Sequence, residues 1–317
     1  MAKVINSLLI EMGLTTPPQK TNKEVRTTVD GYPIAIFHRE TASDTLEFVG
    51  KYNFNNDKST AETFGFSDGD ESWEFSNNTS DRCLFKSADF SGTDWTNNFE
   101  SRYPDDDAIN AEYEAGTRKP EKLMAVTSWV VSTKDNLDKF KNEVRNHFNL
   151  DNLIAYYLIT ELFGMVDQRA KNMFLTYFHE EGKWIFIFYD NDTCFGLNNE
   201  GLIAFGYNIE YHDKIGTLNV WNGESSVLWN NLEKCFPSEI EAMYKDIRPR
   251  GLLSYDLIMS VLNGEQSDKW CEAIYNADGR FKYIDPLIEE GNGSYLYAAQ
   301  GSRIENRKWW TYNRFLY

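Results

Sequence analysis

The chain has 317 residues, of which 41% are apolar, and a formal net charge of -17. This length and apolar content allow a large core, built as one domain or as two lobes. The acidic balance argues against nucleic acid as a partner, because each phosphate contact would work against the average field of the protein. No run approaches the roughly 18–20 apolar residues of a membrane span, so we expect no membrane partner either.

The four cysteines are far apart in the sequence and form no Cys-x-x-Cys pair: Cys83, Cys194, Cys235 and Cys271. This spacing argues against a zinc site or a disulfide framework and indicates a reducing compartment. The N-terminal residues lack the apolar run and the cleavage site of a signal peptide. We therefore expect a cytoplasmic protein.

The N-terminal segment is predicted to begin with a helix over residues 3–12, since its apolar residues recur at helical spacing and Gly13 follows. Pro17 and Pro18 then predict an extended stretch. After them, residues 25–37 predict a β-hairpin.

That hairpin would join a strand over 25–29 to one over 34–37 through a turn at Asp30-Gly31. Residues 48–54 are expected to add a third strand to the same sheet. Residues 55–128 are rich in Asn, Asp, Ser and Gly and predict a loop-rich, partly β region. Its strand-like runs are 72–75 and 83–85.

Helical patterns dominate from about residue 132. One amphipathic helix is expected over 135–148, started by Ser132 or Thr133, and a more apolar one over 151–163, capped by Asn149 or Asp151. Further helices are predicted over 225–236, 238–247, 254–262, 268–276 and 303–315.

Between these helices, the apolar runs 172–178 and 184–189 predict a second β-hairpin. Asp167 and Asn172 precede it, whereas Asp190 and Asp192 follow it. Because the outer ends of a hairpin are adjacent, we expect these polar residues to lie close together.

Asp167 and Asn172 are five residues apart, which is the spacing of a kinase catalytic loop. In phosphoryl transfer a carboxylate such as Asp167 can accept a hydroxyl proton, and an amide such as Asn172 can bind a divalent metal. Arg169 and Lys171 lie between them, where a cation would neutralise a phosphate. The plainer alternatives are an aspartate that bonds its own turn and cations exposed on a loop.

Asp190 and Asp192 would lie on one face of a regular strand, where two carboxylates repel each other unless a cation or the solvent compensates. Mg²⁺ or Mn²⁺ suits such oxygen ligands. Three alternatives stay open for this pair: a kinase metal site, a solvated turn, and the Asp-x-Asp site of a metal-dependent glycosyltransferase that binds a nucleotide sugar.

The segment from about residue 151 to 196 resembles the CotH (spore coat protein H-type) kinase family. The resemblance rests on the helix start at 148–154, Asp167 with Asn172, the strand at 172–177, and the run from Trp184 to Gly196. Weaker similarities are Asp30-Gly31 and the stretch 50–54. The sequence as a whole is similar in character to family members that are encoded by phages and gut bacteria.

This resemblance implies an α+β, atypical protein-kinase-like fold. Residues 1–130 would form a small β-rich part that resembles an N-lobe, and residues 131–317 a larger, mainly helical part that carries the hairpin. The two parts are expected to form one cooperative unit.

The resemblance also implies a function, namely transfer of the γ-phosphoryl group of ATP to Ser or Thr hydroxyls of a protein, with Mg²⁺ or Mn²⁺. Asp167 matches the catalytic aspartate, Asn172 and Asp190 match the metal ligands, and Asp192 matches a second acidic position. The expected partner is a protein substrate or a structural protein. The expected location is the cytoplasm of a bacterium or of a phage-infected host, or association with a virion.

One feature of the family is missing from this chain. The family has a nucleotide-phosphate lysine on a strand before its first helix, whereas this chain begins at what resembles that helix. We therefore expect a fragment of a longer protein or an incomplete N-terminal lobe. Lys51, Lys58 and Lys86 are the candidate substitutes, and the sequence does not distinguish among them. A kinase-like binding module without transfer chemistry is the alternative function.

Overall fold

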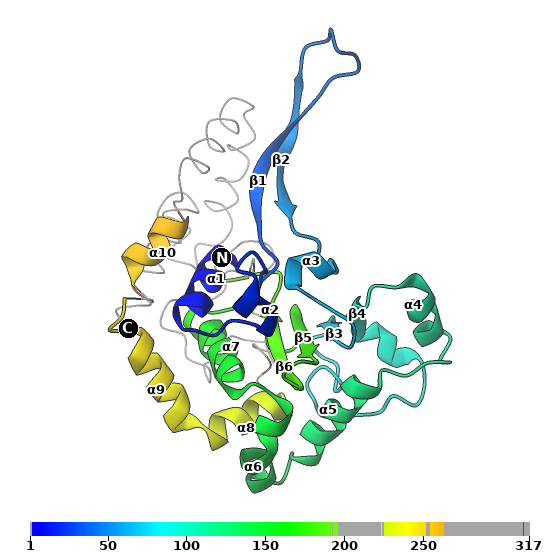
Figure 1. Cartoon of the computed structure of the whole chain (residues 1–317), viewed down its shortest axis with the longest axis vertical. Helices are drawn as coiled ribbons and strands as arrows, with labels where there is room; N and C mark the ends of the chain where they lie inside the picture. The colour runs from blue at the N-terminus through cyan, green and yellow to red at the C-terminus, as the bar shows by residue number, and fades with distance from the viewer. Residues whose placement is uncertain are drawn as a thin grey trace, which may run out of the picture.

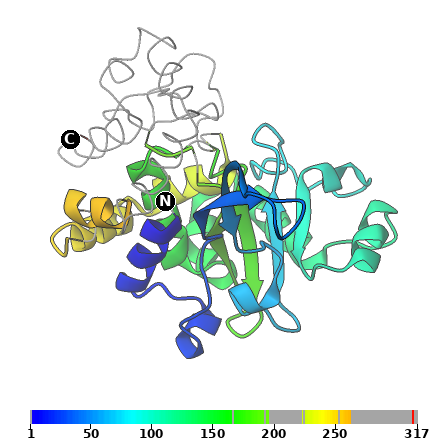
Figure 2. The same cartoon turned by 90° about the horizontal axis from the view of Figure 1, so that it is seen from above.

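The computed structural model describes residues 2–165, 167–191, 193–195, 225–251 and 254–262, with Gly223 and Asn313. Within this part, helices surround a central sheet and a two-stranded arm projects from the body (Figure 1). The cyan segment with α4 (Asp107–Glu114) and the blue helix α1 (Ala2–Glu11) lie on opposite sides of the molecule in both views (Figures 1 and 2). The fold class is therefore α+β, as the sequence predicts.

The central sheet has four antiparallel strands in the order β4-β3-β5-β6. Its strands are β3 (Glu71–Phe75), β4 (Phe99–Tyr103), β5 (Met173–Phe178) and β6 (Lys183–Phe188). The predicted hairpin is confirmed, because β5 pairs with β6 and Met173 lies opposite Phe188. The sheet joins this hairpin to β3, which lies far earlier in the chain.

The two faces of the sheet contact different cores, because successive side chains of a strand point to opposite faces. Trp73, Leu175 and Phe186 belong to the large core. Phe174 and Ile187 belong to a smaller cluster that contains Phe64 and Phe66 of the preceding helix and turn. Burying one such aromatic side chain contributes about 1.5–3 kcal/mol to stability.

Helices cover the large core, and α7 contacts β6 directly. Helix α7 is apolar on nearly every side, as expected of a helix surrounded by protein. The other helices at this core are α1 (Ala2–Glu11), α5 (Glu121–Ser132), α6 (Leu137–His147), α8 (Val227–Cys235), α9 (Pro237–Ile247) and α10 (Tyr255–Leu262), with α7 at Leu150–Leu162.

These helices confirm the predicted ones at 3–12, 135–148, 151–163, 225–236, 238–247 and 254–262. The cap of α7 is Asn149, but α6 begins after Asn136 rather than after Ser132 or Thr133. The predicted helix at 268–276 lies outside the described residues, as does all of 303–315 except Asn313. The predicted boundary between residues 130 and 131 falls inside α5 and stays a prediction.

The extended stretch predicted at Pro17-Pro18 is wrong, since these residues begin helix α2 (Pro17–Thr21). Thr16 accepts a hydrogen bond from Gln19 N, and the Gln19 side chain accepts one from Thr16 N. This capping box starts a helix, and proline fits its first positions because no partner for the missing N–H is needed there.

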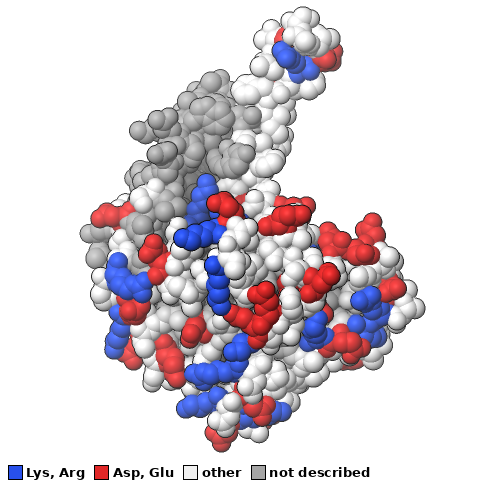
Figure 3. Space-filling model, viewed as in Figure 1, with Lys and Arg blue, Asp and Glu red and all other residues white. Residues whose placement is uncertain are grey.

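The hairpin predicted over residues 25–37 is also wrong. Strand β1 (Gly31–His38) pairs instead with β2 (Glu47–Asn55) and forms the projecting arm. Residues 25–29 lie outside any strand, and Thr28 makes an isolated bridge with Phe188. On the face drawn in Figure 3, charged side chains of the arm are seen at its tip, whereas both charges are interspersed over the body.

The region 55–128 is more ordered than its composition predicts. The strand at 72–75 is confirmed as β3, whereas residues 83–85 lie in a turn in which Phe85 has a φ of 52°. The additional elements are α3 (Ala61–Phe64), the 3₁₀ helix η1 (Asp94–Asn97), β4, α4 (Asp107–Glu114) and α5. No helix among the described residues is long and apolar enough to cross a membrane.

Gly65 ends α3 with a φ of +70°, and a Cβ there would overlap the side chain of Pro18. We expect Gly65→Ala to lower the free energy of unfolding by about 1–2 kcal/mol for the left-handed backbone and by about 1–3 kcal/mol more for overpacking. Gly13→Ala is the control, because Gly13 has a φ of +75° with open space around it. Equal losses in urea unfolding would contradict the packing at Gly65.

Candidate functional site

Asp167, Asn172 and Asp190 have an unusual backbone, with φ values of 71°, 56° and 53°. The described residues include only two other non-glycine residues with positive φ, Phe85 and Phe195. Left-handed backbone is disfavoured for residues with a side chain, less so for Asp and Asn, and it clusters at functional sites. The backbone thus singles out three of the residues that the sequence predicts for catalysis and metal binding.

Hydrogen bonds bring these three residues to one end of the β5–β6 hairpin. Asp167 O accepts bonds from Ala170 N at 2.9 Å and Lys171 N at 2.7 Å, which closes a turn before β5. Asn172 N donates to Phe75 O of β3 at 3.0 Å.

The loop before β5 is also tied to the segment after β6. The Gln168 side chain donates to Asp190 O at 2.9 Å, while Gln168 O accepts from the hydroxyl of Tyr156 at 2.6 Å. Burial raises the pKa of Tyr156 well above its usual value, so this hydroxyl stays a donor. Gln168 is a site residue that the sequence analysis misses, because only the folded chain places it against Asp190.

The Asp167 side chain is nearly buried, with 5% of the residue exposed. Asn78 Nδ2 donates a hydrogen bond to Asp167 Oδ1 at 2.6 Å. Asn78 lies in the loop that follows β3, and nothing in the sequence indicates its contact with a residue so much later in the chain. This bond fixes the orientation of the carboxylate.

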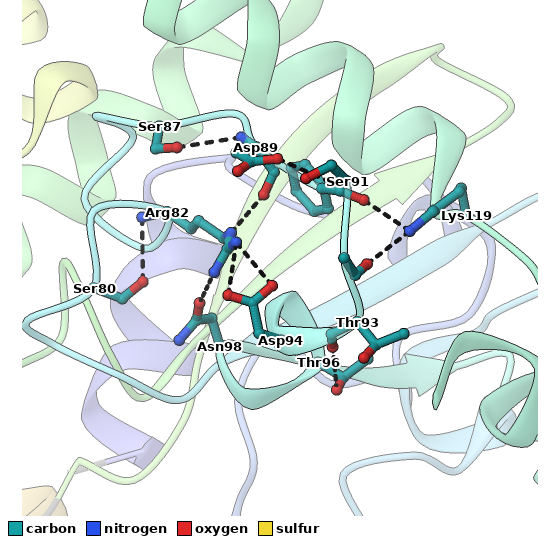
Figure 4. A network of polar contacts seen from close by, with 12 residues as sticks. Ser80, Arg82, Ser87, Asp89, Ser91, Thr93, Asp94, Thr96, Asn98 and Lys119 are labelled. Atoms are coloured by element: carbon teal, nitrogen blue, oxygen red, sulfur yellow. Dashed lines mark hydrogen bonds and ion pairs between the residues drawn. The ribbon is translucent and has the colours of Figure 1, made fainter. Parts of the chain in front are cut away.

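A polar network holds the loop that carries Asn78 (Figure 4). The Arg82 guanidinium donates to Asp89 O at 2.6 Å, to Asn98 Oδ1 at 3.1 Å and to both carboxylate oxygens of Asp94 at 3.1 Å. Lys119 Nζ donates to backbone carbonyls of the same loop. The network fastens the loop to the start of β4 and thereby supports the position of Asn78.

Arg169 lies beneath the site rather than facing solvent. Its side chain is fully buried, forms an ion pair with Glu161 and lies 4.5 Å from the ring centroid of Tyr157. Burial raises the pKa of Tyr157 to about 12, although Arg169 opposes the shift. Trp229 Nε1 donates to Arg169 O at 2.7 Å, which anchors the loop further. Phosphate binding by Arg169, and by the partly exposed Lys171, stays a prediction.

Strand β6 ends at Phe188, and Asp190 is exposed after it. The expectation that Asp190 and Asp192 share one face of a regular strand is therefore wrong at Asp190, because the backbone turns there. Asp192 lies outside the described residues.

The oxygen atoms of Asn172 and Asp190 are of the kind that Mg²⁺ or Mn²⁺ prefers as ligands. In the described part of the chain, no group of three or more His, Cys, Asp or Glu residues is arranged to hold a metal. Mg²⁺ in proteins commonly uses one or two carboxylates, with waters and substrate phosphates as the other ligands. The donor set thus fits a metal that is shared with a nucleotide.

A family model described as CotH kinase protein matches residues 52–250, a range that includes the central sheet and all three residues of this site. The chain belongs to the CotH kinase family. The resemblance inferred from the sequence is thereby confirmed, and membership supports a kinase-like function for this CotH family protein. Comparison with curated proteins gave no match. The similarity to members encoded by phages and gut bacteria stays a prediction.

Replacing Asn78 in this CotH family protein tests the contact with Asp167. We expect Asn78→Ala to lower the free energy of unfolding by about 1–3 kcal/mol, because a nearly buried carboxylate oxygen loses its donor. Asn77→Ala is the matched control in the same loop, since the Asn77 side chain accepts its bonds from nearby Thr79. Urea unfolding measures both. Equal effects, or no coupling with Asp167→Ala in a double-mutant cycle, would refute the contact.

Proposed function

We propose that this protein is an ATP-dependent phosphotransferase that requires Mg²⁺ or Mn²⁺ and acts on Ser or Thr hydroxyls of a protein. The observation that carries the proposal is the convergence of Asp167, Asn172 and Asp190, all with left-handed backbone, at one end of the β5–β6 hairpin. Family membership supports a kinase-like reaction at that end.

Asp167 acts as the general base in the proposed reaction. It accepts the proton of the acceptor hydroxyl while the hydroxyl oxygen bonds to the γ-phosphorus. The bond from the γ-phosphorus to the β–γ bridging oxygen breaks, and ADP leaves with that electron pair. The amide of Asn78 occupies Oδ1 of Asp167, so Oδ2 is the oxygen proposed to accept the proton.

Asn172 and Asp190, with Asp192 as a second acidic position, would hold the metal. When bound, the metal supplies positive charge that offsets the charge of the phosphates and aligns them. Arg169 is proposed to offset the charge of the phosphates from beneath the loop, which it also stabilises through its ion pair with Glu161. Lys171 is proposed to approach the phosphates.

We further infer a protein as acceptor or structural partner, inside a bacterial cell or a phage-infected host, with association with a virion as the alternative. The net charge of -17 supports a protein rather than a nucleic acid as partner.

Asp190→Asn tests the metal assignment. ATP with Mn²⁺ at about 100 times its Kd adds roughly 2.7 kcal/mol to the stability of the wild type, which raises its Tm by several degrees. We expect the variant to lose this rise, because a carboxylate that binds the metal becomes a neutral amide.

Asp68→Asn is the matched control for this thermal-shift measurement. Asp68 is exposed and lies two residues from Asp70, which accepts a bond from His179 N at the turn between β5 and β6. That turn is the opposite end of the hairpin. A rise in Tm that survives in Asp190→Asn contradicts the metal assignment.

Asp167→Asn separates chemistry from binding. We expect the variant to keep the Tm rise with ATP and Mn²⁺ but to transfer labelled γ-phosphate to a protein acceptor at least about 100-fold more slowly, because the general base is lost. Asp68→Asn again serves as the control. Transfer at the wild-type rate in Asp167→Asn would exclude Asp167 as the base.

A further inference from the structure

A cavity of about 390 Å³ opens where the β1–β2 arm meets the end of β6. Its lining brings together segments that are far apart in the sequence, among them Asn55, Asn56, Lys58, Ser59, Arg102 and Tyr189. Tyr189 directly precedes Asp190, so the lining includes the residue that is next to the candidate site in the sequence.

Two cations share one buried carboxylate beside this cavity. Lys58 Nζ lies 2.9 Å and Arg102 Nε 2.6 Å from Oε2 of Glu74, whose side chain is 9% exposed. Arg102 also pairs with Glu100, but Glu100 is 55% exposed, so solvent screens that pair. Lys58, Arg102 and Glu74 together have one more positive than negative charge, which the exposed carboxylate of Glu100 balances.

Lys58 is the member of the cluster that is open to the cavity. Its side chain is 30% exposed, against 11% for Arg102. Burial lowers the pKa of Lys58, but the hydrogen bond and the charge of Glu74 outweigh burial and raise it. Lys58 is therefore charged at neutral pH and can contact an anion.

Aromatic contacts link Lys58 to the ends of β5 and β6 that lead to the candidate site. Lys58 Nζ lies 3.3 Å from the hydroxyl oxygen of Tyr189 and 4.8 Å from its ring centroid. The Tyr189 ring stacks on Phe174 with 5.0 Å between centroids. Each aromatic residue is close in sequence to a proposed metal ligand, Tyr189 to Asp190 and Phe174 to Asn172.

These contacts distinguish Lys58 from the other lysines that the sequence left open. Lys86 Nζ donates to Ser225 Oγ instead. The side chain of Lys51 lies outside the described part of the chain.

We infer that this cavity binds a phosphate group, with Lys58 as the cation that contacts it and with Glu74 and Arg102 as positioning residues. Asn55, Asn56 and Ser59 supply uncharged hydrogen-bonding groups. The inference rests on the proposed function, which provides two sources of the phosphate: the phosphate chain of the nucleotide, or a phosphorylated side chain of the acceptor protein. Asp57 and Asp105 also line the cavity, but both residues are exposed, so solvent screens their carboxylates.

The test is the affinity of the full chain and of Lys58→Gln for three probes: inorganic triphosphate, ATP and a phosphoserine peptide. Isothermal titration is done with a metal chelator, so that binding does not depend on Asp190. We expect the variant to bind triphosphate about 10- to 100-fold more weakly, the loss typical of one charge-assisted bond. A selective loss for triphosphate and ATP assigns the cavity to the nucleotide, whereas a selective loss for the phosphoserine peptide assigns it to the acceptor.

Lys122→Gln is the matched control. Lys122 Nζ lies 2.9 Å from Oε1 of Glu71, on the same strand as Glu74, and 5.1 Å from the ring centroid of Tyr177. It thus repeats the lysine–glutamate–tyrosine arrangement at the other end of β3. Thermal unfolding of both variants shows whether either substitution disturbs the fold.

The inference is overturned if the wild type binds none of the probes, or if Lys58→Gln and Lys122→Gln bind them alike. If triphosphate binding depends on Lys58 but the Tm rise with ATP and Mn²⁺ is unchanged in Asp190→Asn, the proposed function is refuted and the phosphate site in the cavity is supported. If the Tm rise with ATP and Mn²⁺ requires Asp190 but not Lys58, the proposed function is supported and phosphate binding in the cavity is refuted.

Discussion

The pairing of β3 with β5 is the contact on which the candidate site depends. It joins a segment near residue 73 to one near residue 175, with Glu74 opposite Phe174 and Phe75 opposite Met173. The same register positions Asn172 N against Phe75 O. Because side chains alternate along both strands, a slip of one residue would move Glu74 into the large core and Phe75 out of it.

The same strand, β3, leads to two features: the Asn78 contact with Asp167, and the Glu74 cluster beside the cavity. The chain leaves β3 toward Asn78, which reaches Asp167, and the residues of β3 itself position Glu74 under Lys58 and Arg102. A single strand therefore supports both the proposed base and the proposed phosphate cavity. Loss of the pairing would disturb both at once.

The left-handed residues of the site need a rigid support, since such backbone costs about 1–3 kcal/mol per residue. The support comes from buried groups beneath the loop: Arg169 with Glu161, Trp229 on Arg169 O, and Tyr156 on Gln168 O. Buried ion pairs of this kind hold a geometry more reliably than they add stability. The strain at Asp167 and Asn172 is thus offset by contacts in the core.

The sequence by itself determined the local features: the hairpin at β5–β6, the apolar helix α7 with its Asn149 cap, and the order of Asp167, Asn172 and Asp190 along the chain. These follow from periodicity, capping and spacing, which act over a few residues. It misassigned Pro17-Pro18, where the local capping box of Thr16 and Gln19 starts a helix, and Gly31, where pairing with β2 overrides the turn preference. Only the tertiary structure decided the contacts of Asn78, Gln168 and Lys58. Their partners lie far away in the sequence, and no local pattern encodes a contact that is made by sheet register and loop packing.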